Sequence, residues 1–460
     1  MLDAATTEPL LDGVSRVNMG AVYADVEMEP WTEVVARHDE LLREQITYLA
    51  EESPYYRRRF EEWDVDPGDV TGHRDLPAIP FTTKEDERRG QTAGVTDDPL
   101  GDHQIVETEA LSLTLSSSGT TGKPTYFGYT PRDREVTVEM VCRAAHAMGI
   151  RSGDTVLHAI GRPMVPGGLP YIEAYGELGA NVIPAGGTTS AGLVDVLADI
   201  EPDFVHSTPS HLRYLIDRAP EVGDREVADL GVGTLIGGGE PGIANPDIRE
   251  TLRVAWDVDG VREVMGLGDA SPAVAAECPA EDGAHFVGQE YLHVELVDPE
   301  TGEQRDLAAG AEGELVYTPL VREATPLLRF RSGDHARVVG TDCSCGRTSP
   351  RLQVVGRTDD MLIYKGRNVH PAAIRRVVAT IEGASPRVTV VLPEADVYHF
   401  ESPIPIRVVR EEGTDREAAT IADEIATRVR DELRVRVDPT IVSAAEASLS
   451  KYKTDLVVVE

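Results

Sequence analysis

Residues 111–129 read LSLTLSSSGTTGKPTYFGY, a stretch in which a loop rich in glycine and hydroxyl groups joins two strand-like runs. Leucine alternates with polar residues from position 111 to 115, which is typical of a β-strand, and a second such run covers residues 126–129. Glycines let the loop backbone approach a ligand closely, and consecutive N–H groups can surround an anion. Hydroxyl groups and one lysine add donors and charge. The stretch therefore predicts a phosphate-binding loop.

The loop differs from the GxxxxGK[ST] type, in which the lysine opens a helix. Here Lys123 is followed by Pro124, which does not fit inside a first helical turn at that point. The alternative interpretation is an ordinary flexible hairpin loop, which the coincidence of hydroxyls, glycines and one lysine disfavours. The residues predicted to bind phosphate are Ser116, Ser117, Ser118, Gly119, Thr120, Thr121, Gly122 and Lys123.

The amino-acid composition limits the kinds of partner and the cellular environment that we expect for this chain. Its 460 residues include 80 acidic and 44 basic ones, a formal net charge of −36. Both signs alternate along the chain, so we expect an acidic surface that disfavours nucleic acids and anionic membranes. Dense charge with few aromatic residues indicates a high-salt, halophilic cytoplasm. No run of 18 apolar residues and no signal-peptide pattern is present, so we expect a cytoplasmic protein.

Lysine is scarce, and this scarcity makes each lysine a better functional candidate than usual. Arginine supplies all the other basic side chains. The lysines are Lys84, Lys123, Lys365, Lys451 and Lys453.

The texture of the chain predicts two domains of the α/β class. Helix and strand patterns alternate through residues 131–265, which indicates a parallel sheet with helices on its faces. Short strands separated by Gly, Pro and Asp predict a β-rich subdomain at about residues 267–356. The pattern then changes to that of a small α+β domain. We therefore expect an N-terminal domain at residues 1–356 and a C-terminal domain at residues 357–460.

Several motifs occur together and in a characteristic order. They are SSSGTTGKPT, GGGEP (237–241), RFRSGD (329–334), CSCGRTSPR (343–351) and GRTDDMLIYKGRNVHP (356–371). With LPAIPFTTKED before the loop and STPSHL after it, they resemble the adenylate-forming acyl ligases, and more narrowly their phenylacetate–coenzyme A ligase branch.

This resemblance implies a reaction in two steps. A carboxylate attacks the α-phosphate of ATP to give acyl-AMP and pyrophosphate, and the thiol of coenzyme A then displaces AMP. The implied substrates are ATP, coenzyme A and a small carboxylic acid of the aromatic or arylacetic class, such as phenylacetate, with Mg²⁺ as cofactor. The C-terminal domain is expected to be a mobile lid that rotates between the two steps.

The resemblance also assigns site residues. The phosphate loop with Lys123 holds the β- and γ-phosphates, and Lys453 matches the catalytic lysine, with Lys451 as the alternative. Asp359 matches the hinge, with Asp360 as the alternative, and Gly366 matches the coenzyme A channel. An ionised Asp334 suits the ribose hydroxyls. The residues assigned to adenine and ribose are Gly239, Glu240, Pro241, Met265, Gly266, Asp334 and Arg351.

Two motifs depart from the family pattern. Where the family usually has Tyr-Gly-x-Ser/Thr-Glu, this chain has MGLGD at residues 265–269, in which Asp269 keeps a carboxylate for Mg²⁺. SKYKTD near the end lacks the usual glycine and arginine around the lysine. Because of these departures, one alternative function is a nucleotide-binding protein with weak catalytic activity. A second alternative is an adenylyltransferase that releases a nucleotidyl product without coenzyme A.

Cysteine in a cytosolic chain indicates metal binding or buried thiols. Cys₃His is a closed set of ligands for structural Zn²⁺, and the family resemblance implies such a set here, with incidental thiols as the alternative. Cys142 is expected in the core, and His211 either touches the acyl group or lies on a helix surface. The acid and the oligomeric state, a homodimer included, stay open. The predicted zinc ligands are Cys278, His285, Cys343 and Cys345.

Overall fold

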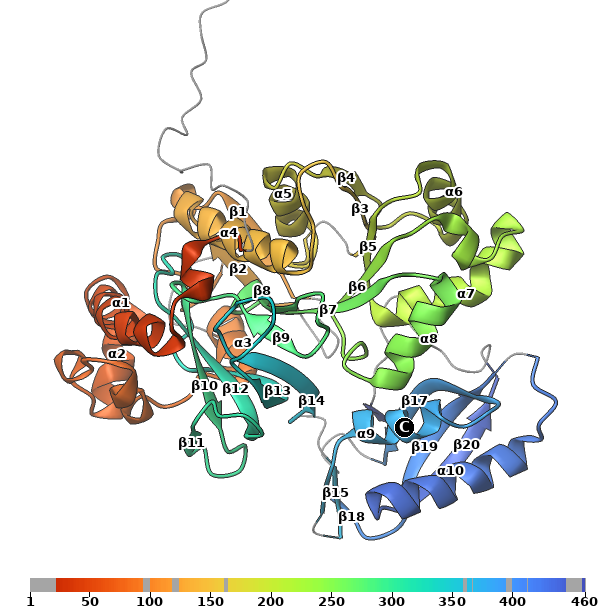
Figure 1. Cartoon of the computed structure of the whole chain (residues 1–460). Helices are drawn as coiled ribbons and strands as arrows, with labels where there is room; N and C mark the ends of the chain where they lie inside the picture. Colours follow the sequence, from red (N-terminus) through yellow and green to blue (C-terminus); the bar gives the residue numbers. More distant parts are fainter. Residues whose placement is uncertain are drawn as a thin grey trace, which may run out of the picture.

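A twelve-stranded mixed sheet formed by the described residues is the central element of the fold (Figure 1). Its order is β11-β10-β12-β13-β14-β9-β8-β7-β6-β5-β3-β4. The structure, a computed structural model, describes residues 22–93, 100–117, 124–160, 164–358, 362–365, 367–393, 399–411, 413–443 and 457–459. The strands are β3 (Thr155–His158), β4 (Asn181–Pro184), β5 (Phe204–Ser207), β6 (Thr234–Gly238), β7 (Gly260–Leu267), β8 (Ser271–Glu277), β9 (Ala284–Phe286), β10 (Leu292–Val297), β11 (Gln304–Arg305), β12 (Glu312–Pro319), β13 (Phe330–Gly340) and β14 (Arg351–Arg357).

The strands from β4 to β7 are parallel and are covered by helices on both faces. Successive strand residues point to opposite faces, so both sets of side chains are apolar. Leu157 and Leu235 pack in a core with α6, α7 and α8, whereas Val156 and Ile236 pack with α4 and α5. The predicted parallel sheet and its α/β class are confirmed. The helices are α4 (Pro131–Ala147), α5 (Leu169–Glu177), α6 (Ser190–Ile200), α7 (Pro209–Gly223), η5 (Val227–Leu230) and α8 (Pro246–Trp256).

The antiparallel strands continue the same sheet. β7 pairs with β8 through Val264 and Ala276, and the remaining strands to β14 follow on from there. Residues 267–356 are β-rich as expected, and their strands join the parallel ones in one hydrogen-bonded sheet. The turn between β7 and β8 therefore lies where the sheet changes from parallel to antiparallel.

The N-terminal segment covers one end of the antiparallel strands and then forms the hairpin of the phosphate-loop stretch. α1 packs on α2 in an apolar core that also holds Leu320 and Leu328 from the sheet region. A β-bridge joins Thr82 to Phe330 at the start of β13. The elements are η1 (Asp25–Met28), α1 (Trp31–Glu52), α2 (Pro54–Trp63), η2 (Pro67–Asp69), η3 (His73–Ala78), α3 (Lys84–Ala93), η4 (Thr108–Ala110), β1 (Leu113–Ser116) and β2 (Tyr126–Tyr129).

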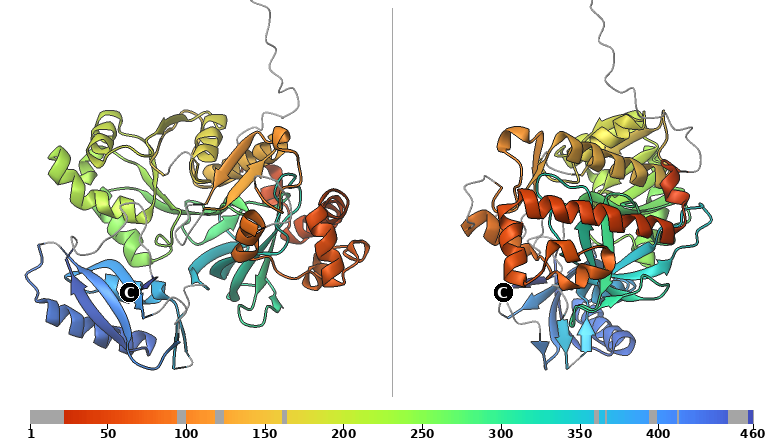
Figure 2. Two further views of the ribbon diagram at one scale, coloured as in Figure 1. Left: turned by 180° about the vertical axis from the view of Figure 1, so that it is seen from behind. Right: turned by 90° about the vertical axis from the view of Figure 1, so that its left-hand side faces the viewer.

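The C-terminal elements have a core of their own and lie beside α8 (Figures 1 and 2). A four-stranded sheet of order β20-β19-β17-β21 packs against α9 and α10. Among the described helices, none combines the length and apolar character that a membrane crossing requires. The elements are β15 (Leu362–Tyr364), β16 (Arg367–Val369), α9 (Pro371–Ala379), β17 (Ala384–Leu392), β18 (His399–Phe400), β19 (Ile404–Arg410), α10 (Ala418–Leu433), β20 (Val437–Val442) and β21 (Val457–Val459).

Candidate active site

The base of the predicted phosphate loop is closed by hydrogen bonds between the two strands of the hairpin. The Ser117 N–H donates to the Thr125 carbonyl at 2.8 Å, and the Thr125 N–H donates back to Ser117 Oγ at 3.0 Å. Ser116 is buried, and its N–H donates to the carbonyl of Met164 at 2.8 Å. Residues 118–123, which include Lys123, lie outside the described residues, so their phosphate contacts stay a prediction.

Asp269, the predicted Mg²⁺ ligand, lies at the β7–β8 turn close to the base of this loop. Its carboxylate accepts a hydrogen bond from the ammonium group of Lys84. The same ammonium donates to Glu87 at 2.6 Å and to Thr125 Oγ1 at 2.5 Å. Burial and the neighbouring Asp269 carboxylate raise the pKa of Glu87 well above its usual value. Lys84 is one of the few lysines of the chain, but its sequence context predicted no specific role for it.

Two glycines allow the β7–β8 turn to pack closely on its surroundings. A Cβ on Gly266 would lie 1.8 Å from the carbonyl oxygen of Pro272. A Cβ on Gly268 would lie 2.9 Å from Cε2 of Phe127 on β2. Both positions are therefore restricted to glycine by contact. Met265, which the sequence assigns to the adenine site, is buried and packs in the core of the antiparallel strands, and its contact with adenine stays a prediction.

The predicted adenine segment lies beside the C-terminal elements. Gly239 has a φ of +81°, a left-handed conformation that favours glycine. Glu240 is buried and accepts a hydrogen bond from the Ser210 N–H at 2.6 Å. Arg375 on α9 donates to the carbonyl of Pro241 at 2.5 Å. Burial lowers the pKa of Arg375, and the Glu240 carboxylate opposes that shift.

Arg357, and not Arg351, lies beside Asp334. The two residues pair across β13 and β14, and Arg357 Nη1 donates to Asp334 Oδ1 at 3.1 Å. Arg351 begins β14 six residues earlier, which is about 20 Å along a strand. Its guanidinium donates to both the carbonyl and the carboxylate of Asp282, each at 2.6 Å. The GRTDD motif contains a signal for Arg357, since this arginine is its second residue.

The hinge, channel and terminal-lysine candidates lie outside the described residues. They are Asp359, Asp360, Gly366, Lys451 and Lys453. The described residues on either side of these segments are held by backbone hydrogen bonds. The Thr358 N–H donates to the Gly333 carbonyl at 2.6 Å, and β21 pairs with β17 through Val457.

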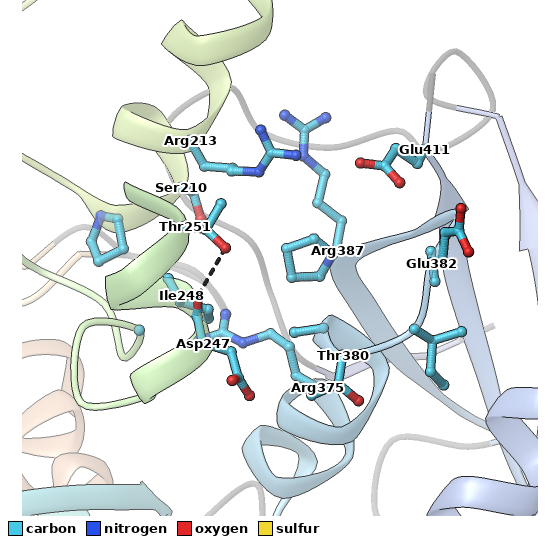
Figure 3. Close-up of a pocket in the computed structure, with 16 residues that line it drawn as sticks. Ser210, Arg213, Asp247, Ile248, Thr251, Arg375, Thr380, Glu382, Arg387 and Glu411 are labelled. Atoms are coloured by element: carbon cyan, nitrogen blue, oxygen red, sulfur yellow. Dashed lines mark hydrogen bonds between the residues drawn. The ribbon is translucent and has the colours of Figure 1, made fainter. Parts of the chain in front are cut away.

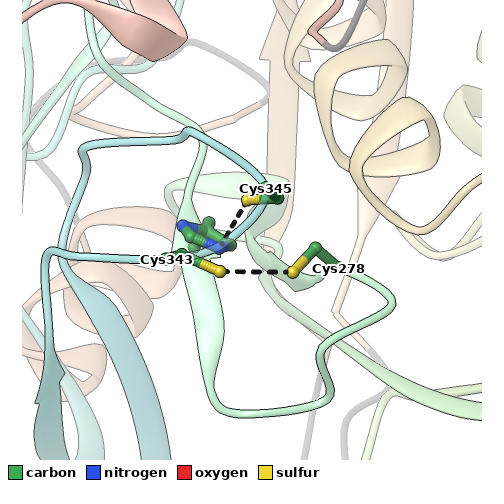
Figure 4. Close-up of side chains that lie close together, drawn as sticks. Cys278, Cys343 and Cys345 are labelled. Atoms are coloured by element: carbon green, nitrogen blue, oxygen red, sulfur yellow. Dashed lines mark hydrogen bonds between the residues drawn. The ribbon is translucent and has the colours of Figure 1, made fainter.

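Four predicted zinc ligands converge at one end of β8, β9 and the β13–β14 loop (Figure 4). Their ligand atoms all lie within 4.8 Å of one another. Cys278 Sγ is 3.6 Å from Cys343 Sγ, and Cys345 Sγ is 3.4 Å from His285 Nε2. Thiolates bound tetrahedrally at 2.3 Å to zinc lie about 3.8 Å apart. The donor set and its spacing therefore fit a structural zinc ion.

A cavity of about 360 Å³ opens between α7 and α8 on one side and α9 and β17 on the other (Figure 3). Arg213 and Arg387 come from opposite walls, and Arg375 also lines the cavity. Ser116, Asp269 and Asp334 do not line it. The cavity separates the C-terminal elements from the main sheet and is distinct from the phosphate site.

Two further residues of interest are buried. Cys142 is fully buried in the core between α4 and α5, as predicted. His211 is also buried, and its Nδ1 lies 2.9 Å from Ser207 Oγ. His211 is therefore not a surface histidine, and it lies at the carboxyl end of β5.

The chain is similar to curated enzymes over most of its length. A phenylacetate–coenzyme A ligase of Thermus thermophilus is 32% identical over 446 residues, 93% of this chain and 96% of that relative. The chain belongs to the phenylacetate–coenzyme A ligase family. Members from Escherichia coli and Pseudomonas putida are 30% and 35% identical and cover 93% and 75% of this chain, and 95% and 75% of the relatives themselves. No family model matches the chain.

Solved structures of another coenzyme A ligase share the fold of this family member. 2-Hydroxyisobutyryl-CoA ligase in the postadenylation state, with an acyl-AMP bound, has a TM-score of 0.86 at 25% identity, over 98% of this chain and 94% of that chain. The same enzyme in the thioesterification state has a TM-score of 0.71 at 26% identity, over 97% and 94%. The arrangement described here is thus more similar to the postadenylation arrangement.

Proposed function

We propose that this family member is an ATP-dependent ligase that joins an aromatic or arylacetic acid to coenzyme A through an acyl-AMP intermediate. The observation that carries the proposal is the convergence of three segments: the base of the hydroxyl-rich hairpin, Asp269 and Lys84. Acidic and basic groups at the base of an anion-binding loop suit a magnesium–triphosphate substrate. The names of the curated relatives support the ligase activity.

The chemistry requires two anions to meet. An oxygen of the acid forms a bond to the α-phosphorus of ATP, the bond to the bridging oxygen breaks, and its electron pair leaves with pyrophosphate. Residues 116–123 and Lys453 would offset the charges on the phosphates and the incoming carboxylate. Mg²⁺ held by Asp269 would supply further positive charge at the phosphate oxygens. Asp334, oriented by Arg357, would accept hydrogen bonds from the ribose.

The second step uses a rotated lid. We propose that the C-terminal domain begins after Gly356 and turns about Asp359, which brings the backbone near Gly366 to the thiol of coenzyme A. The separate core of the C-terminal elements supports a rigid-body movement. Displacement of AMP then forms the thioester, with AMP as the leaving group.

We also propose a structural zinc ion and a cytoplasm of high ionic strength. The Cys₃His cluster holds a structural zinc ion, which the ligand spacing supports. The protein works in a cytoplasm of high ionic strength, which a net charge of −36 supports because salt screens repulsion between like charges.

The experiment that tests the function is an acid screen in molar KCl with ATP, Mg²⁺ and coenzyme A. The panel contains phenylacetate, benzoate, 2-hydroxyisobutyrate and a medium-chain fatty acid, and chromatography measures AMP and the thioester. We expect AMP and thioester with the aryl acids, both dependent on coenzyme A. Absence of AMP with every acid, while ATP still raises the melting temperature, would contradict the proposal. Pyrophosphate release over many turnovers without coenzyme A, with accumulation of a free nucleotidyl product, would favour the adenylyltransferase, because the ligase would stop after one bound acyl-AMP per chain.

A further inference from the structure

Lys84 is the first residue of α3. The segment before it is hydrogen-bonded to the start of β13, about 250 residues later in the sequence. The Thr82 N–H donates to the Arg329 carbonyl at 3.1 Å, and the Arg331 N–H donates to the Thr82 carbonyl at 2.9 Å. These bonds join the segment to the start of β13. Thr83 then begins α3, because its Oγ1 accepts from the Asp86 N–H at 3.2 Å. Lys84 is therefore the first residue of a helix whose start is fixed by the sheet.

All three N–H donors of the Lys84 ammonium group have partners, and each partner comes from a different element. Glu87 lies one turn along α3, Thr125 at the base of the hairpin, and Asp269 in the β7–β8 turn. The ammonium also lies 5.1 Å from the ring centroid of Phe127, within the range of a cation–π interaction. An ammonium group has three donors in all, so this position satisfies it completely.

The contact with Thr125 joins Lys84 to the phosphate loop. Thr125 Oγ1 lies 3.0 Å from Ser117 Oγ, and Ser117 is the last described residue before the loop. The Lys84 ammonium is therefore separated from the loop base by one hydroxyl group. The lysine side chain is 29% exposed, whereas the side chains of Glu87 and Asp269 are 3% and 6% exposed. The ammonium is the more accessible group of this cluster.

The charges of Asp269, the metal ion and the triphosphate would determine which group the Lys84 ammonium contacts when a nucleotide binds. The nearly buried Asp269 carboxylate would repel a triphosphate, and the repulsion is strong where water is excluded. A divalent cation at Asp269 makes the contact between Asp269 and Lys84 redundant, because the metal then supplies the positive charge. The ammonium, still anchored through α3 and one hydroxyl group from the loop base, would then be free to donate to a phosphate oxygen bound at the loop.

We propose that Lys84 is a phosphate-binding residue of the adenylation step, which moves from Asp269 to the β- or γ-phosphate when the metal–nucleotide complex binds. This inference rests on the proposed function and extends its site. As the bond between the α-phosphorus and its bridging oxygen breaks, the electron pair leaves with pyrophosphate, and Lys84 stabilises that growing negative charge. In the nucleotide-free protein the same ammonium holds the Asp269 carboxylate in place.

The test compares Lys84→Gln, Lys84→Arg and a control on the same helix. Arg89→Gln is the control, since its side chain is 62% exposed and contacts Glu85 and Asp86, both on α3. One measurement is the melting-temperature shift caused by ATP with Mg²⁺, which needs no substrate acid. The second is the binding of Mn²⁺ alone to nucleotide-free protein, followed by electron paramagnetic resonance.

We expect Lys84→Gln to weaken ATP binding about tenfold to a hundredfold, the usual effect of losing a hydrogen bond from a charged donor. Mn²⁺ alone should bind as tightly or more tightly, because the competing ammonium is gone. Lys84→Arg should recover part of the ATP effect, and it carries the test if Lys84→Gln does not fold. The control should match the wild type.

Two results would overturn the inference. One is an unchanged ATP shift in Lys84→Gln. The other is an equal loss of ATP and Mn²⁺ binding, which would give Lys84 only the role of holding Asp269 in position. Failure of the proposed ligase activity is distinguishable, because it would leave the ATP shift intact while every acid in the screen gave no AMP.

Discussion

Gly268 occupies the position where the family usually has serine or threonine. A Cβ there would lie 2.8 Å from Cγ of Pro166 and 2.9 Å from Cε2 of Phe127. Phe127 is buried, and its ring also lies beside the Lys84 ammonium. The missing hydroxyl is therefore linked to a close approach of the hairpin to the β7–β8 turn. This departure from the family pattern reflects local packing.

Gly268→Ala tests this packing. We expect the added methyl group to force Phe127 or Pro166 aside and to lower the free energy of unfolding by about 1–3 kcal/mol, the usual cost of overpacking. Denaturant unfolding in molar KCl measures it. The matched control is Gly176→Ala on α5, where nothing lies within 4 Å of the added Cβ. Since alanine favours a helix, the control should be neutral or stabilising, and equal losses in both variants would contradict the interpretation.

A motif can single out a residue without giving its partners. The motif RFRSGD predicts Asp334 at the ribose, and the structure places this residue on β13 beside Arg357, so that its contact with ribose stays a prediction. The sequence assigns Arg351 to the ribose region and gives Arg357 no role, although both arginines follow Asp334 within the next 23 residues. Only the pairing of β13 with β14 decides which guanidinium reaches the carboxylate. Register between distant strands is set by the whole sheet, so one motif cannot reveal it.

Elements with a strong period were predictable, and elements without one were not. The alternation through residues 131–265 gave the parallel strands and their helices. β8 reads SPAVAAE and has no alternation that would predict it, because alanine has low β-propensity and every residue of the strand is buried. The position of α3 was also unpredictable, since the bridge from Thr82 to Phe330 spans some 250 residues of sequence. The sequence singles out Lys84 as one of few lysines, but its place beside Asp269 depends on this long-range contact.

The Cys₃His cluster joins the β8–β9 region to the β13–β14 loop, beside the ion pair between Asp282 and Arg351. Cys278 follows β8, His285 lies in β9, and Cys343 and Cys345 lie in the loop between β13 and β14. Each of the three segments is short. A metal held by all three would fix the ends of neighbouring strands and so contribute directly to folding.

Cys345→Ser tests the proposed zinc ion. We expect the purified wild-type protein to contain one zinc ion per chain, and we expect the variant to lose zinc and to melt at a lower temperature. Removal of zinc from the wild type with a chelator should cause a similar fall. Elemental analysis and thermal unfolding measure both effects. Cys142→Ser is the control, because Cys142 is buried in another core and its loss should leave the zinc content unchanged. A wild type without stoichiometric zinc would contradict the proposal.

At the scale of the whole molecule, Arg375 connects the C-terminal elements to the predicted adenine segment. It is buried on α9 and donates to the Pro241 carbonyl. The cavity between α7, α8 and α9 shows that the two parts are otherwise loosely packed at this edge. The TM-scores of 0.86 and 0.71 associate the present arrangement with the postadenylation state. Under the proposed lid movement, the Arg375 contact would belong to the arrangement that resembles the postadenylation structure.

Arg375→Ala should affect the two half-reactions unequally. Loss of a buried hydrogen bond from a charged donor costs about 1.5–3 kcal/mol, and the proposed rotation of the C-terminal domain would break this contact before the second step. We expect pyrophosphate release without coenzyme A to slow at least tenfold, whereas conversion of supplied acyl-AMP to thioester should change little. Arg376→Ala is the control, because Arg376 is the next residue of α9 and is exposed. Equal slowing of both half-reactions in Arg375→Ala, or equal effects of the two variants, would show that the contact serves stability alone.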